Sequence, residues 1–250
     1  MIFTIAAREL RGLFLSPLAW TVLAVVQAIL AWIFLLLLDE FLQLQSQLLG
    51  VPGAPGVTDL VAAPLLRAAA WILLIVMPLL TMRLISEERR SRTLCLLLSA
   101  PVSMTEIVLG KYLGILTFVG IVVFMISLMP LSLLAGTSLD LGKLLAGLLG
   151  LALMLASFAA LGLYLSTLTA QPAVAAASTF GVLLLLWIID ATTGPREEVT
   201  NLLAYLSLLR HYEALLMGMF ISADVVYYLL FIGAFLALSV RRLDNERLQH

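Results

Sequence analysis

The residue types that most often carry catalytic or metal chemistry are scarce in this chain. Its two histidines are His211 and His250, and its single cysteine is Cys95. None of the three stands near a second histidine, a further cysteine or a carboxylate pair at the spacing of a metal site. A Gly-Lys pair occurs at 110–111, but Thr105 occupies the position of the first glycine of a phosphate-binding loop. We therefore expect no metal or cofactor bound by this chain and no ATP hydrolysis through that motif.

The segment richest in polar chemistry is residues 86–101, where carboxylates and guanidinium groups are followed by a run of leucines. Glu87 and Glu88 would occupy the first turn of a short helix, where negative charge is favoured. Arg92 follows Glu88 at the spacing of an ion pair on one helix face, and Pro101 would end the helix. Charged and apolar groups presented together suit a docking element for a partner protein. The alternative is a solvated turn helix that only joins its neighbours.

The elements that must position this segment are strongly apolar. Hydrophobic residues make up 63% of the chain and charged residues 12%, with a net charge of −1, whereas soluble proteins carry about 25% charged residues. So few charges cannot cover a water-exposed surface. This composition excludes a soluble enzyme, a disordered chain and a free nucleic-acid binder, and it predicts a lipid membrane as the surroundings.

Continuous apolar runs predict an all-α integral membrane protein with a single transmembrane domain, residues 1–250. A helix crosses the bilayer with about 20 apolar residues, and barrel strands would alternate instead. The uncharged run 144–189 would measure roughly 69 Å as one helix. The hydrocarbon core is only about 30 Å thick, so the run must form two helices. The second helix is expected to start at Pro172. Ser222 or Asp224 would cap the last helix. The six predicted transmembrane helices span about 18–38, 61–82, 112–135, 144–167, 172–190 and 225–240.

The basic residues predict the orientation of these helices. Six helices place both termini on one side, and the segments on that side carry ten of the fourteen lysines and arginines. Because cytoplasmic loops are enriched in lysine and arginine, we expect both termini in the cytoplasm. Within the predicted spans, Arg67 and Asp190 lie near the outer ends and no charge lies at a centre. This pattern disfavours an ion-coupled transporter.

The N-terminal residues 1–15 form a predicted surface helix. Apolar and polar side chains are mixed along it, and Ser16-Pro17 then breaks the chain before the first span. We expect an amphipathic helix that lies on the cytoplasmic membrane surface, the alternative being an extension of the first span. On the same side, Ser103 and Glu106 match a capping box and predict the start of the third long helix.

Two longer segments, 39–60 and 191–223, are expected on the outer side. Within the second, residues 201–220 have a helical pattern of apolar residues interrupted by Arg210, His211 and Glu213. We expect a helix that lies at the outer interface or dips partway into the membrane. An ordinary loop with a packed helix is the equal alternative.

Small residues in the predicted helices favour close packing. A glycine has no side chain to separate two helix backbones, so helices can approach closely at that position. Six glycines are expected to act in this way: Gly110, Gly114, Gly120, Gly142, Gly147 and Gly150.

The charged segment and its neighbours resemble one family of membrane proteins. Residues 87–94, 96–103 and 106–111 look like the loop between the second and third helices of type-2 permeases of ATP-binding-cassette (ABC) transporters. In that family the loop carries a coupling helix that contacts the ATPase subunit. Residues 161–171 resemble the family's turn between helices four and five, and the resemblance extends over nearly the whole chain.

A further likeness points to one branch of that family. His211, Tyr212 and Glu213, together with Gly218 and residues 224–228, resemble the gliding-motility-type branch, which is close to the permeases of nitrous-oxide-reductase maturation. There are two departures in the coupling segment. Cys95 stands where the family usually has a glutamate, and Arg92 stands where it often has a glycine.

The resemblance implies a permease subunit of an ABC transporter in a bacterial inner (cytoplasmic) membrane, with a coupling helix between helices 2 and 3. Such a subunit is not itself an enzyme: ATP and Mg²⁺ bind to a separate P-loop ATPase subunit. ATP hydrolysis there is coupled to transport or to force transmission across the membrane. The implied assembly contains a second permease copy, expected to form a homodimer, and an extracytoplasmic partner protein on the outer side.

The resemblance also assigns residues to these contacts. Arg8 and Arg11 of the surface helix are expected to lie near the ATPase subunit. On the outer side, the expected partner site consists of His211, Tyr212 and Glu213. The expected ATPase contacts on the coupling helix are Glu87, Glu88, Arg89, Arg92, Thr93 and Leu94.

Two other functional classes compete with this interpretation. An ATPase-independent channel or membrane assembly scaffold would tolerate charge reversal at four positions: Glu87, Glu88, Arg89 and Arg92. An intramembrane enzyme would need polar catalytic groups at membrane depth, and the chain offers no convincing pair.

Overall fold

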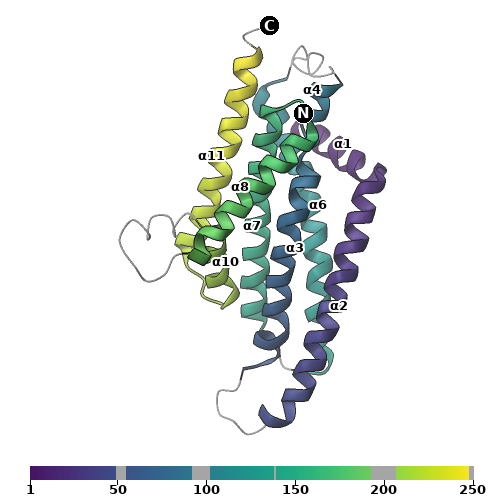
Figure 1. The fold of residues 1–250 in the computed structure, drawn as a ribbon, viewed down its shortest axis with the longest axis vertical. Helices are drawn as coiled ribbons and strands as arrows, with labels where there is room; N and C mark the ends of the chain where they lie inside the picture. Colours follow the sequence, from purple (N-terminus) through teal and green to yellow (C-terminus); the bar gives the residue numbers. More distant parts are fainter. Residues whose placement is uncertain (49–54, 92–101, 138, 193–206, 248–250) are drawn as a thin grey trace.

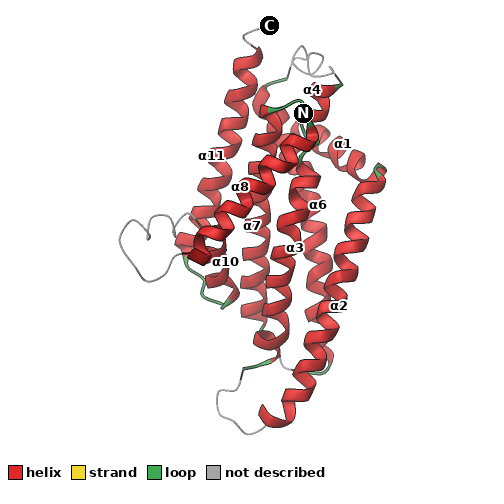
Figure 2. Cartoon of the chain, in the orientation of Figure 1, coloured by secondary structure: helices red, strands yellow, loops and turns green. Residues whose placement is uncertain are grey.

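The computed structural model describes residues 1–48, 55–91, 102–137, 139–192 and 207–247, and within these ranges all regular structure is helical (Figure 1, Figure 2). The predicted all-α class is confirmed. The longer helices are α2 (Pro17–Leu48), α3 (Ala63–Thr81), α6 (Met104–Ser132), α7 (Leu141–Leu168), α8 (Pro172–Thr192) and α11 (Ser222–Arg247). The shorter ones are α1 (Ile2–Leu15), the π-helix η1 (Thr58–Ala62), α4 (Ser86–Arg90), the 3-10 helix η2 (Leu133–Ala135) and α10 (Leu208–Leu216).

Several of these helices are long and apolar enough to cross a membrane, which confirms a multi-pass membrane protein. The predicted fifth span coincides with α8, whose apolar stretch Pro172–Ile188 is shorter than the others. The count of six therefore stays a prediction that depends on α8. Five helices of the described part have the length and composition of a span: Pro17–Gln45, Thr58–Arg90, Met104–Ser132, Leu141–Leu168 and Ser222–Arg247.

The boundaries of several helices differ from the predicted spans, and the largest differences are extensions. The predicted division of the long apolar run is right, because α7 ends at Leu168 and α8 begins at Pro172. However, α2 continues past residue 38 to Leu48, and α11 continues past residue 240 to Arg247. Hydropathy marks only the part of a helix that crosses the hydrocarbon core, and a polar extension keeps its backbone hydrogen bonds in water.

Helix α7 forms the centre of the bundle and packs against α3, α6, α8, α10 and α11. Of its candidate span, 67% is buried, compared with 17% in α2 and in α11. Small residues allow this central position: a Cβ atom added to Gly162 would lie only 2.7 Å from the Cβ of Thr81 on α3. Helices α2 and α11 are therefore the peripheral elements of a single chain.

The glycine predictions are confirmed at four positions and wrong at two. An added Cβ atom at Gly147 would lie 2.9 Å from Cδ1 of Leu66 on α3, and one at Gly150 would lie 3.0 Å from the Cβ of Leu215 on α10. Added Cβ atoms at Gly110 and Gly114 would collide with α1. In contrast, no atom of the described residues lies within 4 Å of such an atom at Gly120, and the nearest one at Gly142 belongs to Asp140, two residues earlier. Small size permits close packing, but only the tertiary arrangement brings a partner helix to the glycine.

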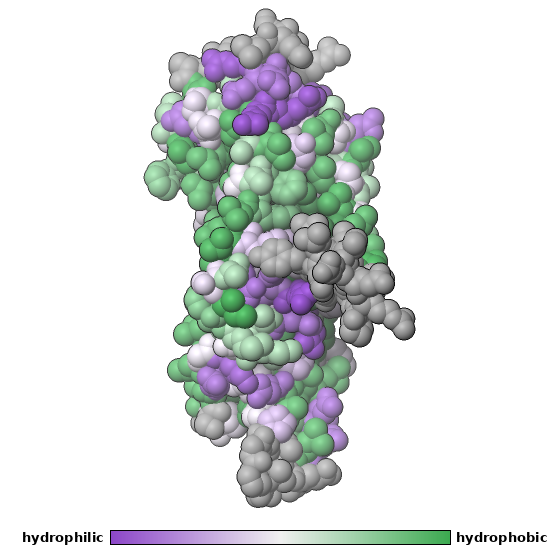
Figure 3. All heavy atoms as spheres, turned by 90° about the vertical axis from the view of Figure 1, so that its left-hand side faces the viewer, coloured by the Kyte–Doolittle hydropathy of each residue, from purple (hydrophilic) through white to green (hydrophobic). Residues whose placement is uncertain are grey.

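The surface divides into a charged end and an apolar belt. We call the end that carries α1, α4 and the last turns of α11 the terminal end (Figure 1). On the face drawn in Figure 3, this end has a hydrophilic cap, followed by a belt of hydrophobic side chains. Large apolar side chains such as Trp32 and Leu230 are 66% and 68% exposed. Exposed apolar area of this extent matches a lipid environment.

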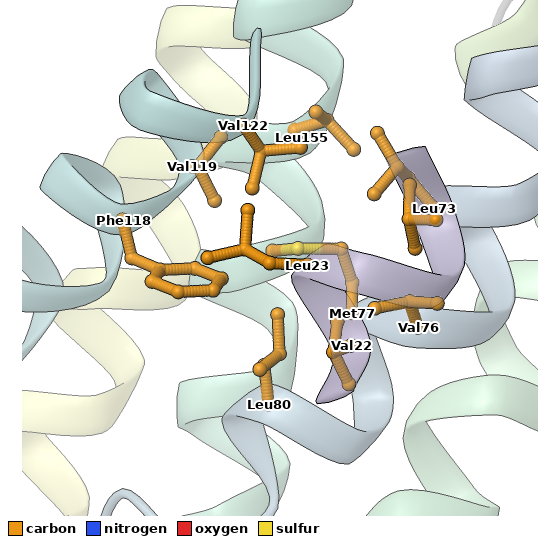
Figure 4. Close-up of a pocket in the computed structure, with 11 residues that line it drawn as sticks. Val22, Leu23, Leu73, Val76, Met77, Leu80, Phe118, Val119, Val122 and Leu155 are labelled. Carbon is orange, nitrogen blue, oxygen red and sulfur yellow. The ribbon is translucent and has the colours of Figure 1, made fainter. Parts of the chain in front are cut away.

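The interior between α2, α3, α6 and α7 is nearly filled. A gap of about 10 Å³ remains there, and every residue that lines it is apolar, including Leu23, Met77, Phe118 and Leu155 (Figure 4). A volume of this size holds at most one water molecule. This gap therefore offers neither the space nor the polar groups that a substrate path would need.

Candidate functional site

The short helix α4 begins directly after α3, and a serine of α7 holds the turn between them. The Ser166 hydroxyl accepts hydrogen bonds from the backbone N–H groups of Ile85 and Ser86, both at 3.0 Å. The same hydroxyl donates to the carbonyl oxygen of Met82 at 3.1 Å. One donor and two acceptor positions are all that a hydroxyl has, so this side chain is fully used. The start of α4 is thereby fixed to the end of α7.

A buried lysine joins α4 to two further helices. Lys111 of α6 is only 2% exposed. Its Nζ atom lies 2.7 Å from Oε1 of Glu9 on α1 and 2.8 Å from Oε1 of Glu88 on α4. A buried ammonium group is costly unless opposite charges and hydrogen bonds compensate it. The Glu9–Lys111–Glu88 cluster provides both, and it ties α1, α4 and α6 together.

The close approach of α1 makes this cluster possible. Helix α1 ends at Leu15 and α2 begins at Pro17, so the predicted break at this position is confirmed. The chain then turns, and α1 lies against α6 at the terminal end (Figure 1). A Cβ atom at Gly114 would lie 2.8 Å from the Cβ of Glu9, which no real structure tolerates. Glycine at this position therefore lets Glu9 reach Lys111.

A second ion pair connects α4 to the C-terminal helix. A terminal nitrogen of Arg89 lies 2.5 and 2.6 Å from the two carboxylate oxygens of Glu246 on α11. Arg242, one turn earlier on α11, lies 3.3 Å from the same carboxylate. The Arg89 and Glu246 side chains are only 17% and 15% exposed. Charge-assisted hydrogen bonds of this length are among the strong ones in proteins.

The structure thus divides the predicted ATPase contacts of the coupling segment into three groups. Glu88 and Arg89 form ion pairs within the chain, while Glu87 is exposed to solvent. Arg90, which was not among the predicted contacts, is exposed as well. The predicted contacts Arg92, Thr93 and Leu94 lie outside the described residues, as do the second half of the predicted helix and its pairing of Glu88 with Arg92.

The start of α6 and the arginines of α1 flank α4, and both were subjects of predictions. The capping box is confirmed: the Glu106 N–H donates to the Ser103 hydroxyl, and the Ser103 N–H donates to the Glu106 carboxylate, both at 3.2 Å. Arg8 and Arg11 are exposed on α1 and line a shallow depression on its outer face. They therefore point away from the face on which Glu9 meets Lys111.

Sequence reasoning missed three residues of this site: Glu9, Lys111 and Glu246. The sequence places Lys111 in an incomplete phosphate-loop match and in the family-like segment 106–111, but it assigns this lysine no partner. Its position at the edge of an apolar run was the available signal, because a lysine there must either reach water or find an acidic partner. Nothing in the local sequence indicates which acidic residue would be that partner.

The predicted outer partner site forms a separate, largely buried cluster. His211 of α10 and Asp224 of α11 lie 2.7 Å apart between Nδ1 and Oδ1, and the imidazole ring stacks on Tyr227 at 4.1 Å. Tyr212 is fully buried, and burial raises the pKa of its phenol. Of the three predicted residues, only Glu213 is partly exposed, and it lies 3.4 Å from Arg67.

The same contacts bear on two expectations about this region. Asp224 does not cap α11 from outside but lies in its first turn and faces His211. Helix α10 forms only the middle of the predicted helix 201–220, because it ends at Leu216, and residues 201–206 lie outside the described residues. Leu215 and Leu216 pack on Gly150 and Gly147, within the candidate span of α7. Helix α10 therefore lies beside the apolar part of α7.

In the residues that the structure describes, no group of three or more histidine, cysteine, aspartate or glutamate side chains could hold a metal ion.

The fold and the site together define a multi-pass α-helical membrane protein whose terminal end carries a bonded network of charged side chains. The sequence matches the family model described as ABC-2 family transporter protein over residues 3–248. The chain therefore belongs to the ABC-2 family, the type-2 membrane components of ABC transporters. None of the curated proteins that were compared with it matches the chain.

Proposed function

We propose that this chain is a permease subunit that receives force from a separate P-loop ATPase at the terminal end, around α4. ATP and Mg²⁺ would be bound by the ATPase and not by this chain. Membership of the ABC-2 family supports this assignment, because ABC transporters pair membrane subunits with ATPase subunits. The observation that carries the proposal is the set of bonds by which α4 is joined to four other helices.

The bonds suit α4 to pass on a displacement. A push on an isolated turn helix would be absorbed by its own bending, whereas α4 is bonded to α1 and α6 through Lys111, to α7 through Ser166 and to α11 through Glu246. In this proposal Glu88 and Arg89 hold α4 in place. The ATPase contacts are then the exposed Glu87 and Arg90, together with Arg92, Thr93 and Leu94 in the following segment.

The rest of the assembly follows from the same proposal. Two copies of the chain would form a homodimer in the bacterial inner membrane, with six transmembrane helices each and both termini in the cytoplasm. The nearly filled interior of one chain supports either a path between two copies or a device that transmits force to an extracytoplasmic partner. In a device that transmits force, the outer segments 39–60 and 191–223 would meet that partner.

Co-purification with a candidate P-loop ATPase, followed by ATP turnover in lipid nanodiscs, tests the proposal. The variant Glu87→Arg reverses an exposed charge on α4. The matched control Glu40→Arg reverses an exposed charge at the far end of α2, in the segment assigned to the extracytoplasmic partner, which this assay does not contain. We expect Glu87→Arg to lower both complex recovery and turnover, and Glu40→Arg to change neither.

Two outcomes would contradict the proposal. Equal behaviour of the two variants in a stable complex would remove α4 from the ATPase contact. If the chain forms no complex with any candidate ATPase, an ATPase-independent channel or an assembly scaffold becomes the better assignment.

A further inference from the structure

A groove at the terminal end lies between α1, the start of α2 and the end of α3. Its volume is about 300 Å³, and it is lined by residues 9–19 on one side and 79–87 on the other. This volume is at the lower end of the range for small-molecule sites, about 300–1,000 Å³. The groove lies at the level where the chain passes from the charged cap to the apolar belt.

The lining of the groove is amphipathic. Its polar side chains are Glu9, Ser16, Arg83 and Glu87. Its apolar side chains are Leu13, Leu18, Ala19, Leu79, Leu80 and Leu84.

The apolar part of the groove is open to lipid at Leu79, whereas Ala19, Leu80 and Leu84 are buried beneath it. Leu79 is 42% exposed, and the neighbouring Leu15 and Trp20 are 84% and 59% exposed. An amphiphile could therefore enter from the membrane and place its chains against these leucines.

The polar part presents one positive and one negative group that are not used inside the protein. Glu9 is bound to Lys111, and the Ser16 hydroxyl accepts the N–H of Leu18. Arg83 and Glu87 are exposed, and neither forms an ion pair in the described part of the chain. A guanidinium group binds phosphate through two parallel hydrogen bonds, and a carboxylate accepts hydrogen bonds from an ammonium group.

We propose that this groove binds a phospholipid whose headgroup carries a phosphate and a primary ammonium group, that is, phosphatidylethanolamine. In the permease chain without an ATPase, Arg83 binds the phosphate and Glu87 binds the ammonium group. Leu13, Leu18 and Leu79 contact the first methylene groups of the acyl chains. A glycerol headgroup leaves Glu87 without a cationic partner. A choline headgroup has no N–H to donate to it.

A wider cleft on the other side of Arg83 and Glu87 is the competing location. Its volume is about 830 Å³, and it is also lined by Arg90, Gln171 and the start of α8. The six apolar side chains of the narrower groove favour the groove for the acyl chains. Arg90 lines the wide cleft and not the groove. A substitution of Arg90 should therefore weaken lipid binding only if the lipid lies in the wide cleft.

Native mass spectrometry of the full chain tests the proposal, with equal amounts of phosphatidylethanolamine, phosphatidylglycerol and phosphatidylcholine in detergent. We expect the wild type to retain phosphatidylethanolamine preferentially. Arg83→Gln should weaken its retention roughly tenfold, the loss expected for a charge-assisted hydrogen-bonded contact. Arg83→Lys should keep part of it, and this variant also controls for misfolding. Glu87→Gln should abolish the preference over phosphatidylglycerol while lipid is still bound.

Three results would overturn the proposal. The first is equal retention of the three lipids by the wild type. The second is unchanged retention of phosphatidylethanolamine by Arg83→Gln. The third is a loss in Arg90→Gln as large as the loss in Arg83→Gln, which would place the lipid in the wide cleft. The measurement uses the permease chain without an ATPase. Its failure would therefore leave the proposed function untouched.

Discussion

At the scale of single residues, Lys111 is the group on which the terminal end depends most. Its ammonium group is buried between the carboxylates of Glu9 and Glu88. Lys111→Met keeps much of the side-chain volume but leaves two carboxylates facing each other without a cation. Breaking a buried ion pair costs about 3–5 kcal/mol. The two glutamates are about a quarter exposed, so water solvates part of their charge. We therefore expect the free energy of unfolding to fall by about 3 kcal/mol, the low end of that range. Unfolding by denaturant in detergent measures it.

Lys143 provides the matched control for this variant. It pairs with Asp59 at 2.9 Å, but both side chains are at least one-third exposed. An exposed ion pair contributes little, because water already solvates both charges. We expect Lys143→Met to change stability much less than Lys111→Met, and equal losses would contradict the role assigned to Lys111.

At the scale of elements, the contact of α1 with α6 decides whether the charged cluster can form. Gly114→Leu would place a side chain where Glu9 and the backbone of Ala6 now lie. We expect α1 to separate from α6, so that amide hydrogen exchange rises along Ile2–Leu15 while α2 keeps its protection. Gly120→Leu, on the same helix but with open space at its Cα, is the control. Unchanged exchange in the Gly114 variant would show that α1 holds its place without this close packing.

At the scale of the whole molecule, the pair between Arg89 and Glu246 connects α4 to the last helix across most of the chain length. In the complex with an ATPase, Arg89→Glu should lower coupled ATP turnover, because it places two carboxylates against each other. The double variant Arg89→Glu with Glu246→Arg restores opposite charges and should recover most of the turnover.

The double variant separates two roles of Arg89. If Arg89 contacts the ATPase directly, reversing Glu246 cannot repair the loss. If a folded double variant does not recover ATP turnover, Arg89 contacts the ATPase directly. It would then not be one of the residues whose bonds hold α4 in place.

The parts of the fold that depend on local sequence were predictable. The division of the long apolar run at Pro172, the break at Ser16-Pro17 and the capping box at Ser103 and Glu106 all appear in the structure. Each rests on interactions within a few residues: a missing N–H, a restricted φ angle or a side chain that caps its own helix. The extent of α2 and α11 was underestimated, because hydropathy does not sense polar helical turns outside the membrane.

The candidate site was predictable only in part. The sequence by itself determined that residues 86–101 carry charge between two long apolar helices, since helix length and hydropathy are local properties. Only the tertiary structure decided which charges meet. Lys111 and Glu9 are 102 positions apart, and Arg89 and Glu246 are 157 positions apart. Such pairs form because packing around α7 and the glycines of α6 brings distant helices into contact. Glu88 and Arg89 therefore face inward, and Glu87 remains at the surface.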